Sequence, residues 1–413
     1  MSAGTRGVDT VVSAGGAQAA VGDAEVRLDA DELIAAARQA TGLSDFGEPD
    51  PDESLRTLVR SLNEEAALTP GGAAGRRLGL IRVLANRLLL QNEFRRDPTL
   101  EQESIRSPIV ILGLPRSGTT KLHRMIGADP VMQKLPLWRL LYPVRALAPA
   151  PPGSSGDPRI HAAEQFVEAI RNRTPDVYAA HPMLATEPDE EYFGMELSFL
   201  SHLNTSSFHT PSYESWLDRQ PFDSWYVWLT RLMQYAQRTD GATGRPWVLK
   251  APHHLGYLPL LLRHFPDATI VHCHRDPTVA VSSFCALLCA SRRSTSTRDE
   301  PTEVGEYAMR IYGKRMQKYQ QDRAALEGTH CFVDVPYGDI VKDAASVIER
   351  CYAAAGLPLP ETSLAAMREW DLRNEQHKHG RHRYELADFG LAPADVTRVF
   401  GTYCERFAPF LAG

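Results

Sequence analysis

The segment from Pro108 to Pro130 carries the residues best suited to binding an anion. Gly113 and Gly118 are separated by four residues and hydroxyl residues follow them, as in the triphosphate-binding loop G-x-x-x-x-G-K-[ST]. Thr119 stands where that loop has its lysine, so the β- and γ-phosphates of a triphosphate would lack a counter-charge. Backbone N–H groups at a helix start, hydroxyl groups and the guanidinium of Arg116 remain. This set of groups favours an anion shorter than a triphosphate.

A second anion-binding segment is HRDPTVAVSSF, which begins at His274. Arg275 lies at the tip of an expected strand, and Asp276 and Pro277 are typical of the start of a helix. Ser283 lies on the same face of that helix, at about 100° per residue, so Arg275 and Ser283 can both face one anion. The pattern indicates a second phosphate site.

Hydrophobic patterning predicts the elements that position these residues. Apolar runs at Ile109–Leu112, 246–250, 268–275 and 331–336 are typical of buried strands, and helical periodicity follows each of them. This alternation predicts an α/β fold, a P-loop-like and mostly parallel sheet flanked by helices, with ligands at the carboxyl ends of the strands. Three helical segments before Arg96 predict an N-terminal helical cap.

The expected organisation has a disordered leader at 1–24, a helical extension at 25–100 and an α/β domain at 101–413. A helical insertion at about 131–240 is rich in acids and aromatic residues. Six of these rings could enclose an apolar acceptor or could simply pack in the core: Trp138, Tyr142, Phe193, Trp216, Trp225 and Trp228.

Composition excludes several classes of protein. The chain has 413 residues, of which 43% are hydrophobic, and a formal net charge of −6, which argues against a nucleic-acid partner. No run approaches the roughly 20 apolar residues of a membrane span. The six cysteines form no C-x-x-C pair or zinc-ligand spacing, which favours free thiols in a reducing cytoplasm. The sequence leaves the oligomeric state open.

The separated motifs resemble those of sulfotransferases that use 3′-phosphoadenosine-5′-phosphosulfate (PAPS), in particular bacterial enzymes acting on small molecules or lipids. The similarity runs over roughly residues 105–400. GLPRSGTT is similar to the loop for the 5′-phosphosulfate, and HRDPTVAVSS to the segment for the 3′-phosphate. HKHGRHRY lies where the family has a basic stretch with Arg-Lys-Gly, from which it departs. The resemblance assigns the donor to Arg116, Ser117, Gly118, Thr119, Thr120, Arg275, Ser283, Lys378 and Gly380. It implies adenosine 3′,5′-bisphosphate (PAP) as product and no metal.

In-line sulfuryl transfer to a hydroxyl needs a base for the acceptor proton. Bacterial members of the family have an acidic pair, matched here by Glu190 and Glu191, and a lysine followed four residues later by histidine, matched by Lys250 and His254. Glu190 is the preferred base, because neighbouring aromatic residues could keep it partly dry. His254 and Glu191 are the alternatives.

The resulting hypothesis is a sulfotransferase acting on a hydroxyl of a small, apolar acceptor. The alternatives are a small-molecule kinase that uses ATP through a degenerate loop, and a nucleotide-binding protein without catalysis. A kinase should place an acidic Mg²⁺ ligand at a second strand end, where Asp276 lies, but the adjacent Arg275 fits phosphate binding better.

Overall fold

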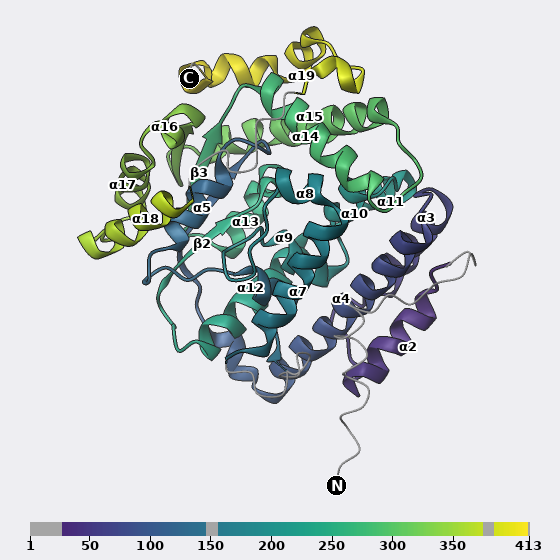
Figure 1. The fold of residues 1–413 in the computed structure, drawn as a ribbon. Helices are drawn as coiled ribbons and strands as arrows, with labels where there is room; N and C mark the ends of the chain where they lie inside the picture. Colours follow the sequence, from purple (N-terminus) through teal and green to yellow (C-terminus); the bar gives the residue numbers. More distant parts are fainter. Residues whose placement is uncertain (1–26, 146–155, 375–383, 412–413) are drawn as a thin grey trace.

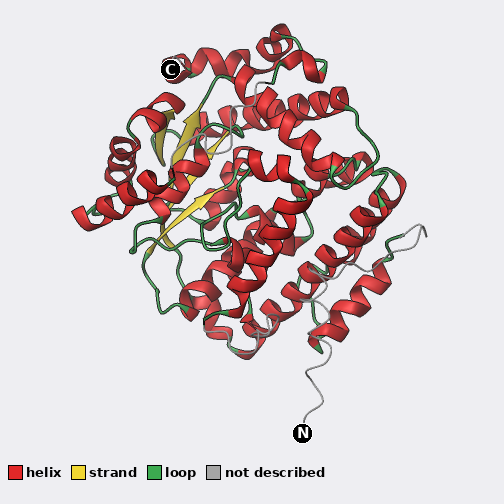
Figure 2. Ribbon diagram, in the orientation of Figure 1, coloured by secondary structure: helices red, strands yellow, loops and turns green. Residues whose placement is uncertain are grey.

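The computed structural model describes residues 27–145, 156–374 and 384–411. Four parallel strands form the sheet in the order β2-β1-β3-β4. Their bounds are Arg106–Gly113 (β1), Pro246–Lys250 (β2), Thr269–His274 (β3) and Cys331–Pro336 (β4). Figure 2 shows these strands together, with helices around them. The predicted α/β class and parallel sheet are confirmed, because continuous apolar runs are what strands buried on both faces require.

Side chains of β1 alternate between two cores. Ile109 and Ile111 pack against α5 (Thr119–Gly127) and α17 (Ala344–Ala354). Val110 and Leu112 point into the larger core, which contains α12 (Asp223–Thr239) and α15 (Pro301–Leu326). Gly113 pairs with Cys273 of β3 and Ile111 with Lys250 of β2, so three strands end at one edge of the sheet. The two anion-binding segments and Lys250 therefore meet there.

The N-terminal helices are part of the larger core. They are α2 (Ala30–Thr41), α3 (Asp52–Glu64) and α4 (Pro70–Arg96), and Figure 1 shows them along one side of the molecule. Arg87 of α4 is buried and donates to the carbonyl oxygens of Phe46 and Leu197 at 2.7 and 2.6 Å, while its guanidinium lies over Trp228 of α12. Burial lowers the pKa of Arg87 to about 9. The expected leader at 1–24 lies outside the described residues.

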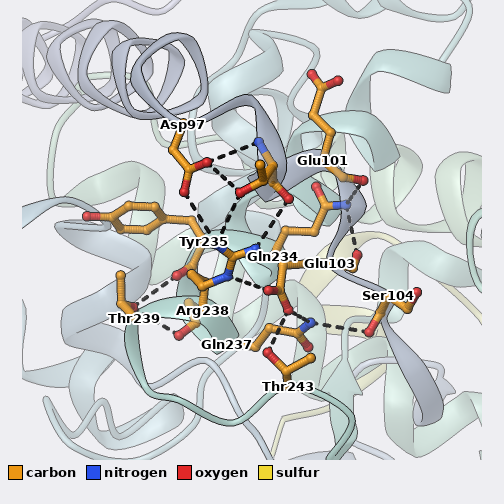
Figure 3. Close-up of polar contacts among 12 residues, drawn as sticks. Asp97, Glu101, Glu103, Ser104, Gln234, Tyr235, Gln237, Arg238, Thr239 and Thr243 are labelled. Atoms are coloured by element: carbon orange, nitrogen blue, oxygen red, sulfur yellow. Dashed lines mark hydrogen bonds and ion pairs between the residues drawn. The ribbon is translucent and has the colours of Figure 1, made fainter.

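A buried carboxylate joins α12 to the chain that leads into β1 (Figure 3). Glu103 follows the short helix η1 (Pro98–Gln102) and accepts hydrogen bonds from Gln237 Nε2 at 2.6 Å and Thr243 Oγ1 at 2.8 Å. Arg238 also donates to it. Burial raises the pKa of Glu103, but these donors outweigh burial and hold the pKa below its usual value. The network fixes the start of β1 against the helical insertion.

The remaining elements cover the sheet edge and the C-terminal side. In the insertion they are α6 (Leu137–Leu141), α7 (Pro158–Arg173), α8 (Pro175–Ala180), α9 (Tyr192–Met195), η3 (Glu196–Ser198), α10 (His202–Ser207) and α11 (Pro211–Leu217). After β2 follow η4 (Pro252–Gly256), α13 (Leu258–His264), α14 (Pro277–Arg293), α16 (Tyr337–Lys342), α18 (Glu361–Arg373), η5 (Leu386–Phe389), α19 (Pro393–Arg406) and α20 (Ala408–Leu411). Within the described ranges, no helix combines the length and apolarity that crossing a bilayer requires.

Candidate active site

The loop between β1 and α5 has the geometry of an anion cradle. Gly113 must be glycine, because a Cβ there would lie 2.4 Å from the Cys273 carbonyl oxygen. Gly118 caps α5 with φ 87°, and Arg116 has φ 70°, which is uncommon for a residue with a side chain. Ser117 Oγ donates to the Leu114 carbonyl at 2.7 Å and is buried, so this hydroxyl closes the loop. Unusual backbone conformations of this kind concentrate at functional sites.

The side chains of Arg116 and Arg275 both make hydrogen bonds at the loop. Arg116 Nε donates to Ser283 Oγ at 3.2 Å, and Arg275 Nη1 donates to the Arg116 carbonyl at 2.5 Å. Arg275 also lies over the ring of Tyr337, 4.0 Å from its centroid. Burial and the charge of Arg275 lower the pKa of Arg116. In the part of the chain that the structure describes, neither guanidinium forms an ion pair with a carboxylate. An anion between them would supply the missing negative charge.

Lys250 connects the loop helix to the acidic segment. Its side chain is fully buried at the end of β2, and Nζ donates to Glu190 Oε1 at 2.7 Å and to Thr120 Oγ1 at 3.4 Å. Glu190 is 13% exposed, so solvent or a ligand can still reach this carboxylate. Residues from β2, α5 and the segment before α9 thus converge on one ammonium group.

Glu191 and His254 form a second pair, which is more deeply buried than the pair of Lys250 and Glu190. His254 Nε2 lies 2.8 Å from Glu191 Oε1, and its Nδ1 lies 2.9 Å from the hydroxyl of Tyr226. Glu191 also accepts from the backbone N–H of Lys250 at 2.8 Å. Burial raises the pKa of Glu191, but its hydrogen bond to His254 and the nearby charges outweigh burial and lower it. Both ring nitrogens of His254 have partners within the protein, and its side chain is fully buried.

Two residues that sequence reasoning missed, His181 and Arg124, hold the acidic segment in place through Asp189. Buried Asp189 accepts from the backbone N–H of Glu190 at 2.7 Å and lies 3.2 Å from His181 Nε2 and 3.6 Å from Arg124 Nη2. Burial alone would raise the pKa of Asp189, yet His181 and Arg124 hold it below its usual range. Arg124 belongs to α5, directly after the loop, and this proximity was the only sequence signal for it.

The other expectations have mixed outcomes. Lys378 and Gly380 lie outside the described residues. The six aromatic residues form no single wall: Trp225 and Trp228 are buried in the larger core, whereas Trp138 and Tyr142 pack in a small cluster with α7. Trp216 donates to Glu53 of α3 at 3.2 Å, and Phe193 contacts both clusters. Periodicity located these rings on helices but could not tell which neighbours they would meet.

Sulfotransferases are the known proteins to which this chain is similar. A family model described as "Sulfotransferase family" matches residues 108–361. Omega-hydroxy-beta-dihydromenaquinone-9 sulfotransferase Stf3 of Mycobacterium tuberculosis is 25% identical over 306 residues, 73% of this chain and 74% of that protein.

Two solved structures are similar over nearly the whole chain. Sulfotransferase STF1 from Mycobacterium tuberculosis H37Rv has a TM-score of 0.78 and 31% identity, covering 92% of this chain and all of the other. Sulfotransferase STF9 from Mycobacterium avium has a TM-score of 0.83 and 26% identity, covering 95% of this chain and all of the other. The chain therefore belongs to the sulfotransferase family and is a sulfotransferase.

Proposed function

We propose that the enzyme transfers a sulfuryl group from PAPS to a hydroxyl group of a small, largely apolar acceptor. One observation carries the proposal: Arg275 donates to the Arg116 carbonyl oxygen in the anion loop, the Arg116 guanidinium contacts Ser283, and neither guanidinium has a carboxylate partner among the described residues. A donor with phosphate groups at its 5′ and 3′ positions provides one negative group for each arginine. The absence of the P-loop lysine disfavours ATP at the same site.

The donor site combines two segments. The loop amides, Arg116, Ser117, Gly118 and the hydroxyls of Thr119 and Thr120 hold the 5′-phosphosulfate, which supplies an activated sulfuryl group. Arg275 and Ser283 hold the 3′-phosphate. The role of the basic stretch with Lys378 and Gly380 stays a prediction.

The proposed acceptor site is built on Glu190 and Lys250, next to the loop. Glu190 accepts the proton of the acceptor hydroxyl while Lys250, between Thr120 and Glu190, stabilises negative charge on the oxygens around the sulfur. In the transfer step, the acceptor oxygen forms a bond to sulfur, the bond between sulfur and the 5′-phosphate oxygen breaks, and PAP leaves. His254 and Glu191 position Lys250 through its backbone N–H. Glu190 is favoured as the base over His254 and Glu191 because a bound acceptor can reach its carboxylate.

An apolar acceptor is supported by the relative named for an omega-hydroxylated menaquinone. Because the identity of that relative to this chain is 25%, the proposal extends to a class of acceptors and not to that one molecule. A hydroxylated lipid or a similar apolar alcohol is the proposed class.

Ligand-dependent thermal unfolding tests the donor assignment. PAP in the presence of EDTA is expected to raise the Tm, since a ligand at 100 times its Kd adds about 2.7 kcal/mol to the unfolding free energy. ATP with Mg²⁺ should raise it much less. Stabilisation by ATP with Mg²⁺ and none by PAP would favour the kinase alternative instead.

A further inference from the structure

A buried arginine near the active site has no counter-ion. Arg315 of α15 is 6% exposed, and its Nη2 has no hydrogen-bond partner. Across the described ranges no carboxylate pairs with it, and its guanidinium lies 5.2 Å from the centroid of the Tyr312 ring. Gly256 lies against its stem, since a Cβ there would be 3.1 Å from Arg315 Cγ. An unpaired buried charge loses hydration without a compensating partner, so a bound anion would stabilise this side chain.

Two buried imidazoles with unused nitrogens lie in the same region, one of them on the short helix η4 that also carries Gly256. His253 has no partner for either ring nitrogen, and His202 has none for Nδ1, although its Nε2 lies 2.7 Å from the Tyr257 hydroxyl. Their rings stack with centroids 5.9 Å apart. Burial, and then the charge of Arg315, lower the pKa of His202 and of His253, so both rings are neutral near pH 7. A neutral imidazole carries one N–H, and each can donate that N–H to an oxygen atom.

The cluster adjoins the proposed acceptor site. His253 follows Lys250 by three residues, and its ring lies 5.1 Å from that of Tyr192. Tyr192 follows Glu190 by two residues and stacks on Phe193 at 4.6 Å. The ring of Trp225 borders His253 on another side, at 6.1 Å. A molecule at Glu190 would therefore have an aromatic surface and then three unsatisfied polar groups within its reach.

We infer that Arg315, His253 and His202 bind a carboxylate on the acceptor, at the end remote from the hydroxyl that is sulfated. The planar guanidinium matches a carboxylate with two parallel hydrogen bonds, and the imidazole N–H groups can donate to the same oxygens. The acceptor class is then an apolar hydroxy acid. This inference rests on the proposed function, because it assigns Glu190 to the hydroxyl end.

The test compares ω-hydroxy fatty acids with their methyl esters, in a series of chain lengths, using PAPS as donor. For the best length, kcat/KM of the acid is expected to exceed that of the ester by about tenfold or more, since hydrogen bonds between charged groups are stronger than those to a neutral ester. Arg315→Met should bring this ratio close to one, and Arg315→Lys should retain part of it. Lys318→Gln, which removes an exposed charge from the same helix, should leave the ratio unchanged.

Stability and binding measurements keep the outcomes distinct. Arg315→Met should not lower the Tm, because it removes an unpaired buried charge. If that variant folds and still prefers the acid, or if the wild type shows no preference, the inference is overturned. Calorimetric binding of the hydroxy acid to the PAP-bound protein gives a readout without turnover: binding to the wild type that Arg315→Met loses supports the inference, and equal binding to both overturns it. If the proposed function is wrong, the wild-type protein should instead fail to bind PAP.

Discussion

Replacing Glu190 by glutamine separates catalysis from folding at the centre of the site. The substitution keeps the size of the side chain and one acceptor oxygen but removes the negative charge 2.7 Å from the buried Lys250 ammonium. Breaking a buried pair completely costs about 3–5 kcal/mol. Because the glutamine oxygen can still accept from Lys250, we expect a smaller loss of about 1–3 kcal/mol in unfolding free energy.

The main effect of Glu190→Gln should be a fall in kcat. A general base contributes about 100-fold or more, so kcat of Glu190→Gln at saturating PAPS should fall by at least that factor, about 2.7 kcal/mol in activation free energy. PAP affinity, measured by calorimetry, should stay near the wild-type value. Glu187→Gln, three residues earlier, is the matched control; its carboxylate accepts from Trp370 at 3.1 Å and should leave kcat within about twofold.

His254→Asn provides the contrasting variant. His254 has partners on both ring nitrogens, and asparagine is too short to reach Tyr226 and Glu191 together. We expect mainly a loss of stability, about 1–3 kcal/mol. If Glu190→Gln keeps most of its turnover while His254→Asn abolishes it with normal PAP binding, the glutamate mechanism is wrong and the histidine is the base.

Three further outcomes are expected. Arg275→Ala should weaken PAP binding far more than AMP binding, because only PAP has a 3′-phosphate; equal losses in calorimetry would count against that assignment. Arg116→Ala should lower kcat more than it weakens PAP binding, since its charge matters most as the leaving oxygen becomes negative, and a pure binding defect would contradict this. Burial raises the pKa of Asp334, but Arg323 and His274 outweigh burial and lower it to about 2. The ionised Asp334 therefore contributes about 2 kcal/mol to the free energy of unfolding above about pH 4, and this contribution is lost as pH falls toward 2. Urea unfolding should show that the stability of Asp334→Asn falls less steeply with acid than the stability of the wild type.

Local patterns were enough to predict the sheet. The segments 246–250 and 331–336 are strands with the same bounds that their apolar runs predict, because strands buried on both faces leave a continuous hydrophobic signal. The anion loop was equally clear, since Gly113 and Gly118 are needed for local backbone geometry. The sequence predicted that Arg275 and Ser283 face one anion at the carboxyl edge of the sheet. In the structure Ser283 Oγ accepts from Arg116 Nε, and Arg275 donates to the Arg116 carbonyl oxygen, a pairing that strand order alone did not specify.

Contacts between side chains of distant segments could not be predicted from local patterns. The contact of Tyr226 with His254 joins α12 to η4, and nothing in either segment's own periodicity specifies the partner. The same holds for Arg315, whose position on α15 fits a helix with no sign that its guanidinium would be buried. Side-chain roles that depend on three or more distant segments therefore required the structure.

Transfer of labelled sulfate is the decisive experiment for sulfation from PAPS with Glu190 as the base. The wild-type enzyme is incubated with PAPS carrying a labelled sulfuryl group and a series of long-chain alcohols and hydroxy acids, with EDTA present, and the products are identified by mass spectrometry. We expect a labelled sulfate ester on the acceptor hydroxyl, formed together with an equal amount of PAP, and strongly reduced in Glu190→Gln. Labelled ester formed equally well by Glu190→Gln, or phosphate transferred from ATP with Mg²⁺ in place of sulfate from PAPS, would contradict it.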